Sequence, residues 1–395
     1  MVFSDPQVLA ALPQLAWPLI LLLAWAGGEA AYRLLGLPRI SSYALVGVLA
    51  APTQLGWLPP SETMSLAAHV GFGLLLFELG HRINLRWFAH NPWLGLSALL
   101  DGLLSFVAIG LLARSLGFDA ASCALMGALG MATSPAALVR VINEERASGQ
   151  IAERLLHLAL VACVLAVLVF KAVLAVHVFN SSGSLTAAIY TGAWSLLLSL
   201  GLGVLAGLVV TALLRLPAEA PDATLPYALA VVAVVALTHG LQLSPIVASL
   251  SLGLTARHRR VVFSRSERGF GGLGELLSVA LFVYLGAKLD LAHVGAGLVV
   301  GLGIVATRLL LTPALMAAFG PLTGVNWRKG ALTGLGLMPL SAFVLLLLEQ
   351  SQHLQIGLLE RLAPLAAAAL VLEIAGPLCT RWALRWGGEG DGGRR

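Results

Sequence analysis

Long apolar runs separated by short polar turns extend over nearly the whole chain. A helix needs about 20 residues to cross the hydrocarbon core of a bilayer, and most of these runs approach or exceed that length. The pattern therefore predicts an all-α polytopic membrane protein with about thirteen transmembrane helices. The predicted spans cover approximately residues 14–35, 40–57, 64–85, 92–116, 121–143, 151–179, 185–214, 223–240, 243–257, 271–287, 292–319, 327–349 and 361–386.

Two of the predicted spans are interrupted near their middle, one by Thr133-Ser134-Pro135 and the other by Met338-Pro339-Leu340-Ser341. Proline removes a backbone donor, and in hydrocarbon the freed carbonyls must be satisfied within the protein. Each break alone could be a simple proline kink. Two breaks at corresponding places in two halves are typical of the binding site of a carrier. The hydroxyls of Thr133 and Ser134 suit a hard cation, although such hydroxyls also satisfy kinked backbone.

Positive charge is concentrated on one predicted side of the membrane. Nineteen of the 24 lysines and arginines fall on the side that holds the C-terminus. The positive-inside rule then predicts an external N-terminus and a cytoplasmic C-terminus in a bacterial-type inner membrane. In this topology the first six and the last six spans run in opposite senses. We predict an inverted repeat of six-helix units at 1–180 and 221–386, a linker helix at 181–220 and a disordered cytoplasmic tail at 387–395.

Composition excludes a soluble protein, because 58% of the residues are hydrophobic and 11% are charged, with a mean hydropathy of +0.91. In a membrane protein the net charge of +5 reports topology and does not indicate nucleic-acid binding. Cys123, Cys163 and Cys379 lie in apolar runs without metal-site spacing, so we predict packed thiols. The sequence contains no catalytic triad, phosphate loop or metal-spaced cluster. We therefore expect that the protein is not an enzyme and binds no cofactor.

Among the charged residues inside predicted spans, those that we take as candidates have apolar neighbours and are Glu78, Asp101, Arg308 and Glu373. An unpaired charge at mid-membrane costs several kcal/mol, so each is a candidate site residue with a partner. Arg308 and Glu373 both lie near mid-depth of spans in the second repeat, and we expect them to form an ion pair. Glu78 or Asp101 is the alternative counter-charge. Purely structural ion pairs are the competing interpretation.

Several motifs together resemble the membrane domain of the monovalent cation:proton antiporter superfamily, Kef-type branch. They are LLGLPRISSYALVGVLAAP, GFGLLLFELGHRINLRWF, ATSPAALVRVINEE, LGAKLDL and TGLGLMPLSAFVLLLL. The resemblance covers nearly the whole chain. It implies a core domain around two crossed, broken helices, a separate panel of helices that forms a homodimer, and alternating access by motion of the core against the panel.

The chain departs from that family where the family binds its ion. Relatives carry Asn-Asp or Asp-Asp in the sixth helix, where this chain has Ala162 and Cys163. In the twelfth helix, Ser341 and Ala342 replace a frequent Gly-Glu pair. A thiol is a poor ligand for a monovalent cation. The basic residue expected in the eleventh helix is matched by Arg308, which cannot release its proton in an accessible pH range.

The leading hypothesis is a secondary transporter that exchanges a small monovalent cation or another small solute for protons. Its candidate site residues are Thr133, Ser134, Cys163, Arg308, Glu373, Glu78, Asp101 and Ser341, with one of the three acids as the titrating group. One alternative is a non-transporting sensor or complex subunit of the same fold. Another is an anion carrier that uses Arg308, because half-helix N-termini and arginine both favour anions.

Overall fold

The structure is a computed structural model of the 395-residue chain. It describes residues 6–214, 223–259, 261, 270–289, 291–340, 344 and 363–390. These residues form helices and turns and contain no strand, so the predicted all-α architecture is confirmed. Ser341 and most of the Arg257–Arg268 segment lie outside the described residues.

The helices in chain order are α1 (Pro6–Leu35), α2 (Arg39–Ala50), α3 (Glu62–Arg82), α4 (Leu85–His90), α5 (Pro92–Ser115), α6 (Ala120–Gly130), α7 (Pro135–Glu144), α8 (Gln150–Ser182), α9 (Leu185–Ile189), the π-helix η2 (Tyr190–Trp194), α10 (Ser195–Leu213), α11 (Thr224–Gly240), α12 (Pro245–His258), α13 (Gly271–Ala287), α14 (Leu291–Phe319), the 3₁₀-helix η4 (Pro321–Thr323), α15 (Trp327–Gly336) and α18 (Ala363–Trp386). Within the described residues, eight helical segments are long and apolar enough to cross a membrane, and α2, α11 and α13 are shorter apolar helices. The total of thirteen spans stays a prediction.

Both predicted breaks are present. The first broken span consists of α6 and α7, and residues 131–134 between them are not α-helical. Ser134 caps α7, because its side chain accepts a hydrogen bond from the Ala137 backbone N–H. In the second, α15 ends at Gly336 and residues 338–340 have no regular structure. The continuation of that span lies outside the described residues, apart from Val344.

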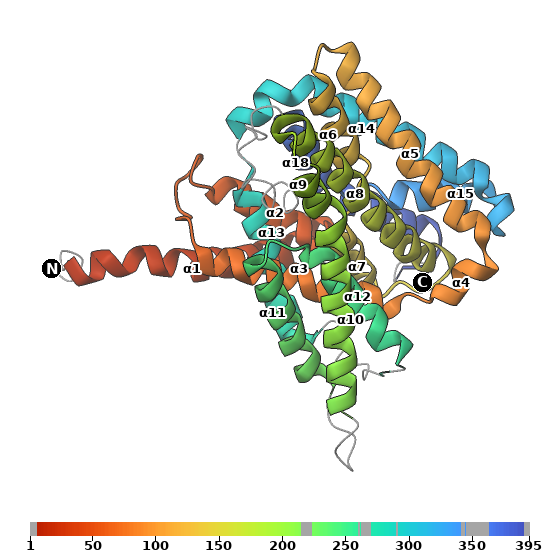
Figure 1. The fold of residues 1–395 in the computed structure, drawn as a ribbon. Coiled ribbons are helices and arrows are strands. Elements are labelled where there is room, and N and C mark those ends of the chain that lie inside the picture. The colour runs from red at the N-terminus through yellow and green to blue at the C-terminus, as the bar shows by residue number, and fades with distance from the viewer. Residues whose placement is uncertain are drawn as a thin grey trace.

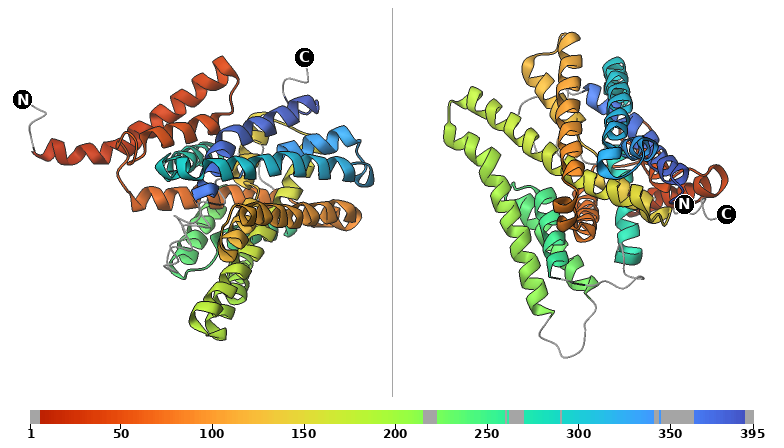
Figure 2. Two further views of the ribbon diagram at one scale, coloured as in Figure 1. Left: turned by 90° about the horizontal axis from the view of Figure 1, so that it is seen from above. Right: turned by 90° about the vertical axis from the view of Figure 1, so that its right-hand side faces the viewer.

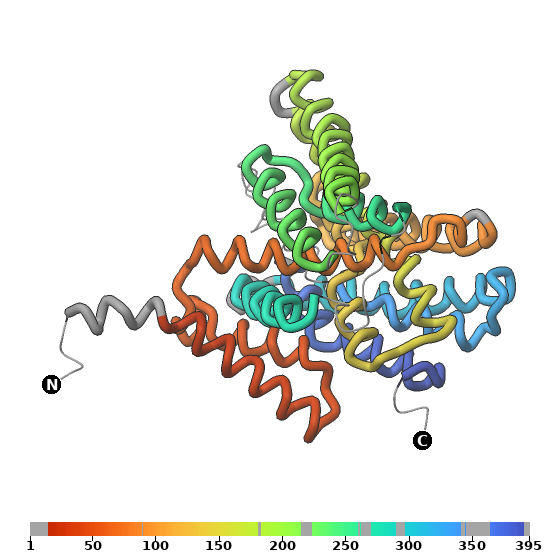
Figure 3. Tube along the Cα trace, turned by 90° about the horizontal axis from the view of Figure 1, so that it is seen from below, coloured from red at the N-terminus to blue at the C-terminus, as the bar shows by residue number. Residues whose placement is uncertain are grey.

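The helices divide into two flanks. Helices α10 and α11 form one flank, and α5, α14, α15 and α18 gather on the other (Figures 1 and 2). Helix α3 runs between α10–α12 and the cluster of α14 and α18 (Figure 3). The buried apolar core extends from α1 through the α6–α7 break to α18. The broken helices are thereby enclosed by protein, where unwound backbone can be satisfied.

Two pairs of helices approach closely through reciprocal glycines. In the α2–α13 pair, a Cβ on Gly47 would lie 2.2 Å from the Val283 carbonyl oxygen, and one on Gly286 would meet α2 in the same way. In the α3–α12 pair, Gly80 and Gly253 repeat this geometry. Gly47 and Gly80 are as far apart in sequence as Gly253 and Gly286. This equal spacing supports the predicted inverted repeat, while its exact boundaries stay a prediction.

Candidate functional site

The two breaks meet in the interior of the molecule. The backbone N–H of Ser134 donates to the Pro339 carbonyl oxygen at 2.6 Å, and the Thr133 hydroxyl donates to the Leu337 carbonyl oxygen at 3.2 Å. All four residues are almost completely buried. The two interrupted spans therefore meet, and that their meeting point is a binding site stays a prediction. We call this meeting point of residues 130–135 and 336–340 the crossing.

Arg308 of α14 joins the two halves of the crossing. Its Nη1 donates to the Gly130 carbonyl oxygen at 2.7 Å, and its Nη2 donates to the Leu337 carbonyl oxygen at 2.9 Å. A third, longer bond of 3.4 Å reaches Thr133 Oγ1. The side chain is 1% exposed. The expected ion pair with Glu373 is absent among the described residues. The guanidinium instead donates to carbonyl oxygens at helix ends, which have no intrahelical donor because the helices are broken there.

Glu373 of α18 lies beside the crossing without joining it. It precedes Gly376 by about one helical turn, and Gly376 packs directly on Pro339. One turn further, Thr380 donates to the Gly336 carbonyl oxygen at 2.8 Å. Glu373 is 5% exposed, and its carboxylate has no hydrogen bond or ion pair in the part of the chain that the structure describes. It is therefore a buried carboxylate next to the crossing with no cation at hand.

Asp101 of α5 is the acidic residue that interacts with Arg308. The carboxylate interacts electrostatically with Arg308 and lies beside Thr312, both on α14, but no ion-pair contact joins it to the guanidinium in the described residues. The next residue, Gly102, packs against Met131 at the first break. Asp101 is thus the acidic group that balances Arg308 electrostatically, a role that the sequence assigned to Glu373 first.

Glu78 does not reach the crossing. Its Oε1 accepts hydrogen bonds from Arg82 Nη2 at 2.6 Å and from Asn143 Nδ2 at 3.0 Å. Arg82 also donates to the Asn143 side chain, so the three residues tie the last turn of α3 to the last turn of α7. Hydrogen bonds from an arginine and an amide satisfy a buried carboxylate. The structure therefore favours a structural role for Glu78 over the predicted titrating role.

Cys163 is completely buried in α8. The same helix contacts the second break in its N-terminal part, where Leu155 packs against Gly336. In the described residues the three cysteines are free thiols, as predicted. No described acid on α8 takes the place of the carboxylate that the resemblance leads one to expect there.

Three consecutive residues at the end of α7, Asn143-Glu144-Glu145, bind three different helices. Asn143 binds α3 as above. Glu144 accepts from the backbone N–H of Arg39 on α2, 3.3 Å from its nearer oxygen. Glu145 pairs with Arg381 and Arg385 of α18 at 2.6 and 2.7 Å. This motif contributes to the family resemblance, but the sequence does not reveal the junction. The partners of the three residues lie far from them along the chain and form no local pattern.

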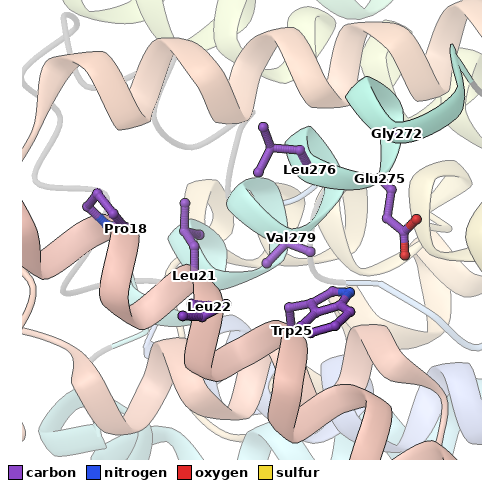
Figure 4. Close-up of a pocket in the computed structure, with 8 residues that line it drawn as sticks. All are labelled: Pro18, Leu21, Leu22, Trp25, Gly272, Glu275, Leu276 and Val279. Atoms are coloured by element: carbon purple, nitrogen blue, oxygen red, sulfur yellow. The ribbon is translucent and has the colours of Figure 1, made fainter.

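A groove of about 470 Å³ opens on the outer surface between α1 and α13. Figure 4 shows apolar side chains on both walls, among them Trp25 and Leu276, with Glu275 at one end. It includes no residue of the crossing. We therefore do not assign it to the transport site.

The crossing offers oxygen ligands of the kind that a hard cation prefers. Gly130 O, Leu337 O and Thr133 Oγ1 surround the guanidinium of Arg308. Carbonyl and hydroxyl oxygens are also ligands for hard cations. Within the described residues, no group of three or more His, Cys, Asp and Glu side chains could hold a metal ion. The oxygens that accept from Arg308 are therefore of a type that also suits a hard cation.

Comparison with known proteins matches most of the chain to one family profile and a third of it to a characterised relative. The profile of the transmembrane sodium/hydrogen exchanger family matches residues 19–386. The Na⁺/H⁺-K⁺ antiporter GerN of Bacillus cereus is 30% identical over 127 residues, which are 32% of this chain and 33% of that protein. The match thus spans about a third of that relative's length.

Solved structures share the fold. Two structures of the sodium/proton antiporter MjNhaP1 from Methanocaldococcus jannaschii superpose on this chain with TM-scores of 0.65 and 0.67. Each covers 94% of this chain and 95% of its own, at 18% identity. At that identity the likeness establishes the arrangement of helices and leaves the chemistry to be argued from the residues.

Proposed function

The chain belongs to the sodium/hydrogen exchanger family, and from this premise we propose that it exchanges a small monovalent cation for protons. In this proposal the cation binds at the crossing and Glu373 is the titrating group. The single observation that carries it is the buried Glu373 carboxylate, without a cationic partner in the described residues, about one turn from the contact between Gly376 and Pro339.

The physical argument is one of charge balance. A carboxylate in a membrane interior needs either a proton or a cation beside it. At Glu373 the two can alternate, because the described part of the chain offers no fixed cation there. Glu373 would carry a proton when the site opens to one side of the membrane and would have a bound cation beside it when the site opens to the other side. The exchange would then be obligatory. Glu78 cannot do the same while Arg82 holds it.

We expect Glu373→Gln to abolish cation-dependent proton movement, because a glutamine side chain cannot take up and release a proton in this pH range. The measurement is the fluorescence of an entrapped pH dye in proteoliposomes after pulses of Na⁺, K⁺ or Li⁺. Glu62→Gln is the matched control, because Glu62 is exposed in the first turn of α3 and should leave exchange unchanged. Exchange that persists in Glu373→Gln at the wild-type rate would exclude Glu373 as the titrating group.

The thiol at position 163 bears on the rate of exchange. Since Cys163 is fully buried in α8 and supplies no carboxylate, we expect weaker exchange than in an acid-bearing relative. Cys163→Asp should raise the exchange rate in the same assay, and Cys163→Asn, of equal size but without charge, is its control. An equal effect of both substitutions would show that the carboxylate at this position does not matter.

The two alternatives remain outcomes of these assays. An anion carrier is less well supported, because the terminal nitrogens of Arg308 already donate to carbonyl and hydroxyl oxygens. A non-transporting sensor or subunit would show no exchange in the wild-type protein. We further propose the Kef-type branch, a homodimer formed by the panel, and a bacterial-type inner membrane with the N-terminus outside and the C-terminus in the cytoplasm.

A further inference from the structure

Four buried polar atoms between α5 and α14 have no hydrogen-bond partner in the part of the chain that the structure describes. Two are on α14, Arg308 Nε and Thr312 Oγ1, and two are on α5, Asp101 Oδ1 and Ser105 Oγ. Thr312 lies close enough to Asp101 to interact with it, although the two do not form a well-oriented hydrogen bond. Buried polar groups are nearly always paired in native proteins, so this cluster requires an explanation.

The four residues face one another across an antiparallel helix pair. Gly303 of α14 packs on Leu112 of α5, and nine residues later along α14, Thr312 lies beside Asp101. This register places Arg308 opposite Ser105. In both helices the two polar residues are four positions apart and share one face. Asp101, Ser105 and Thr312 therefore form one group of acceptors, about one helical turn long, beside the guanidinium. We call it the α5–α14 acceptor group.

We propose that Arg308 has two positions, of which the structure holds one. In the first, the guanidinium binds Gly130 O, Leu337 O and Thr133 Oγ1. In the second, it turns to the α5–α14 acceptor group and leaves those three oxygens to a monovalent cation. The inference rests on the proposed function and adds to it a cation site made of backbone carbonyls, with Arg308 as a tethered competitor.

Each position leaves one set of acceptors without donors, which is why the two can be close in free energy. In the present position Asp101 Oδ1, Ser105 Oγ and Thr312 Oγ1 have no hydrogen-bond partner among the described residues. In the second position the guanidinium gains a charge-assisted bond to Asp101, and the vacated carbonyls need a positive charge that a cation supplies. A cation that binds only to the second state shifts the population toward it. Release of the Glu373 proton would then balance the charge of the arriving cation.

The direct test is the position of Arg308 in cryo-EM structures of the full chain, in Na⁺ or K⁺ salt and in choline salt of equal ionic strength. We expect the guanidinium within hydrogen-bond distance of the Asp101 carboxylate in the alkali cation, and on Gly130 O and Leu337 O in choline. An Arg308 that keeps the same carbonyl partners in both salts overturns the inference.

A second test uses Thr312→Val, which removes a hydroxyl from the acceptor group with little change in shape. Loss of one hydrogen bond corresponds to about a two- to tenfold change in an equilibrium. We expect the cation concentration for half-maximal exchange to rise by about that factor while the maximal rate is retained, and Thr312→Ser to restore it. Thr307→Val is the control, because Thr307 on the same helix already bonds to the Gly303 carbonyl oxygen.

An unchanged half-maximal concentration in Thr312→Val, or an equal rise in Thr307→Val, would contradict the second position. Absence of exchange by the wild-type protein would refute the proposed function instead. The position of Arg308 in the two salts then decides this inference alone, because it is read from structure and does not depend on transport.

Discussion

Replacing Arg308 with methionine is expected to abolish exchange and to lower the melting temperature of the protein. The substitution removes the donors of Gly130 O and Leu337 O and leaves Asp101 without the cation that balances it. Each buried acceptor that loses its partner costs about 1–3 kcal/mol, and an uncompensated buried charge costs more. Thermal unfolding in detergent, followed by size-exclusion chromatography, measures the loss of stability.

Arg308→Lys should recover little of this loss. A lysine ammonium is a compact charge on a flexible stem and does not reproduce the planar fork that reaches two carbonyls at once. Arg114→Met is the control, since Arg114 is exposed near the end of α5, and we expect it to change neither stability nor exchange. If Arg308→Met kept the wild-type melting temperature, the crossing would be held by the contacts between its two breaks alone.

The positions of the two breaks could be predicted from sequence because proline acts locally. Pro135 and Pro339 each interrupt an apolar run, and the need to satisfy freed carbonyls in a membrane requires such breaks to be enclosed. The structure brings them together through the hydrogen bond from Ser134 to the Pro339 carbonyl oxygen. The two breaks therefore followed from the apolar pattern and the chemistry of one residue type, whereas their crossing was implied by the family resemblance.

The partners of the buried charges could not be predicted in the same way. Arg308 binds backbone carbonyls, which every residue carries and which leave no trace in the sequence. The prediction of an ion pair between Arg308 and Glu373 assumed that a buried charged side chain is paired with a side chain of opposite charge. Glu78 is different, because Arg82 lies four residues further along α3 and an i,i+4 pair of opposite charges is a readable signal. This pair was not predicted from the sequence, although the signal is present, and the structure shows it at 2.6 Å.

The second large effect is expected at Glu145, where the end of α7 meets α18. Glu145 is 1% exposed and Arg381 is 4% exposed, and they form an ion pair of 2.6 Å. Glu145→Gln removes the ion-pair partner of the buried Arg381, which keeps only its weaker interactions with Glu144 and the Tyr32 ring. Breaking one partner of a buried pair typically costs about 3–5 kcal/mol, so we expect this variant to unfold at a clearly lower temperature than the wild type.

We expect the single substitutions of Glu145, Arg381 and Arg385 to lower the stability by amounts that follow a fixed order. Such an order distinguishes the effect of the ion pair from that of general packing. Arg381→Met should cost less than Glu145→Gln, because Glu145 keeps Arg385 at 2.7 Å. Arg385→Met should cost least, since its side chain is 37% exposed and water screens the pair. The double variant Glu145→Gln, Arg381→Met should lose less stability than the two single losses added together, because residues in contact are not additive. Strict additivity would mean that Glu145 and Arg381 contribute independently, and the junction between α7 and α18 would then rest on the apolar contacts around it.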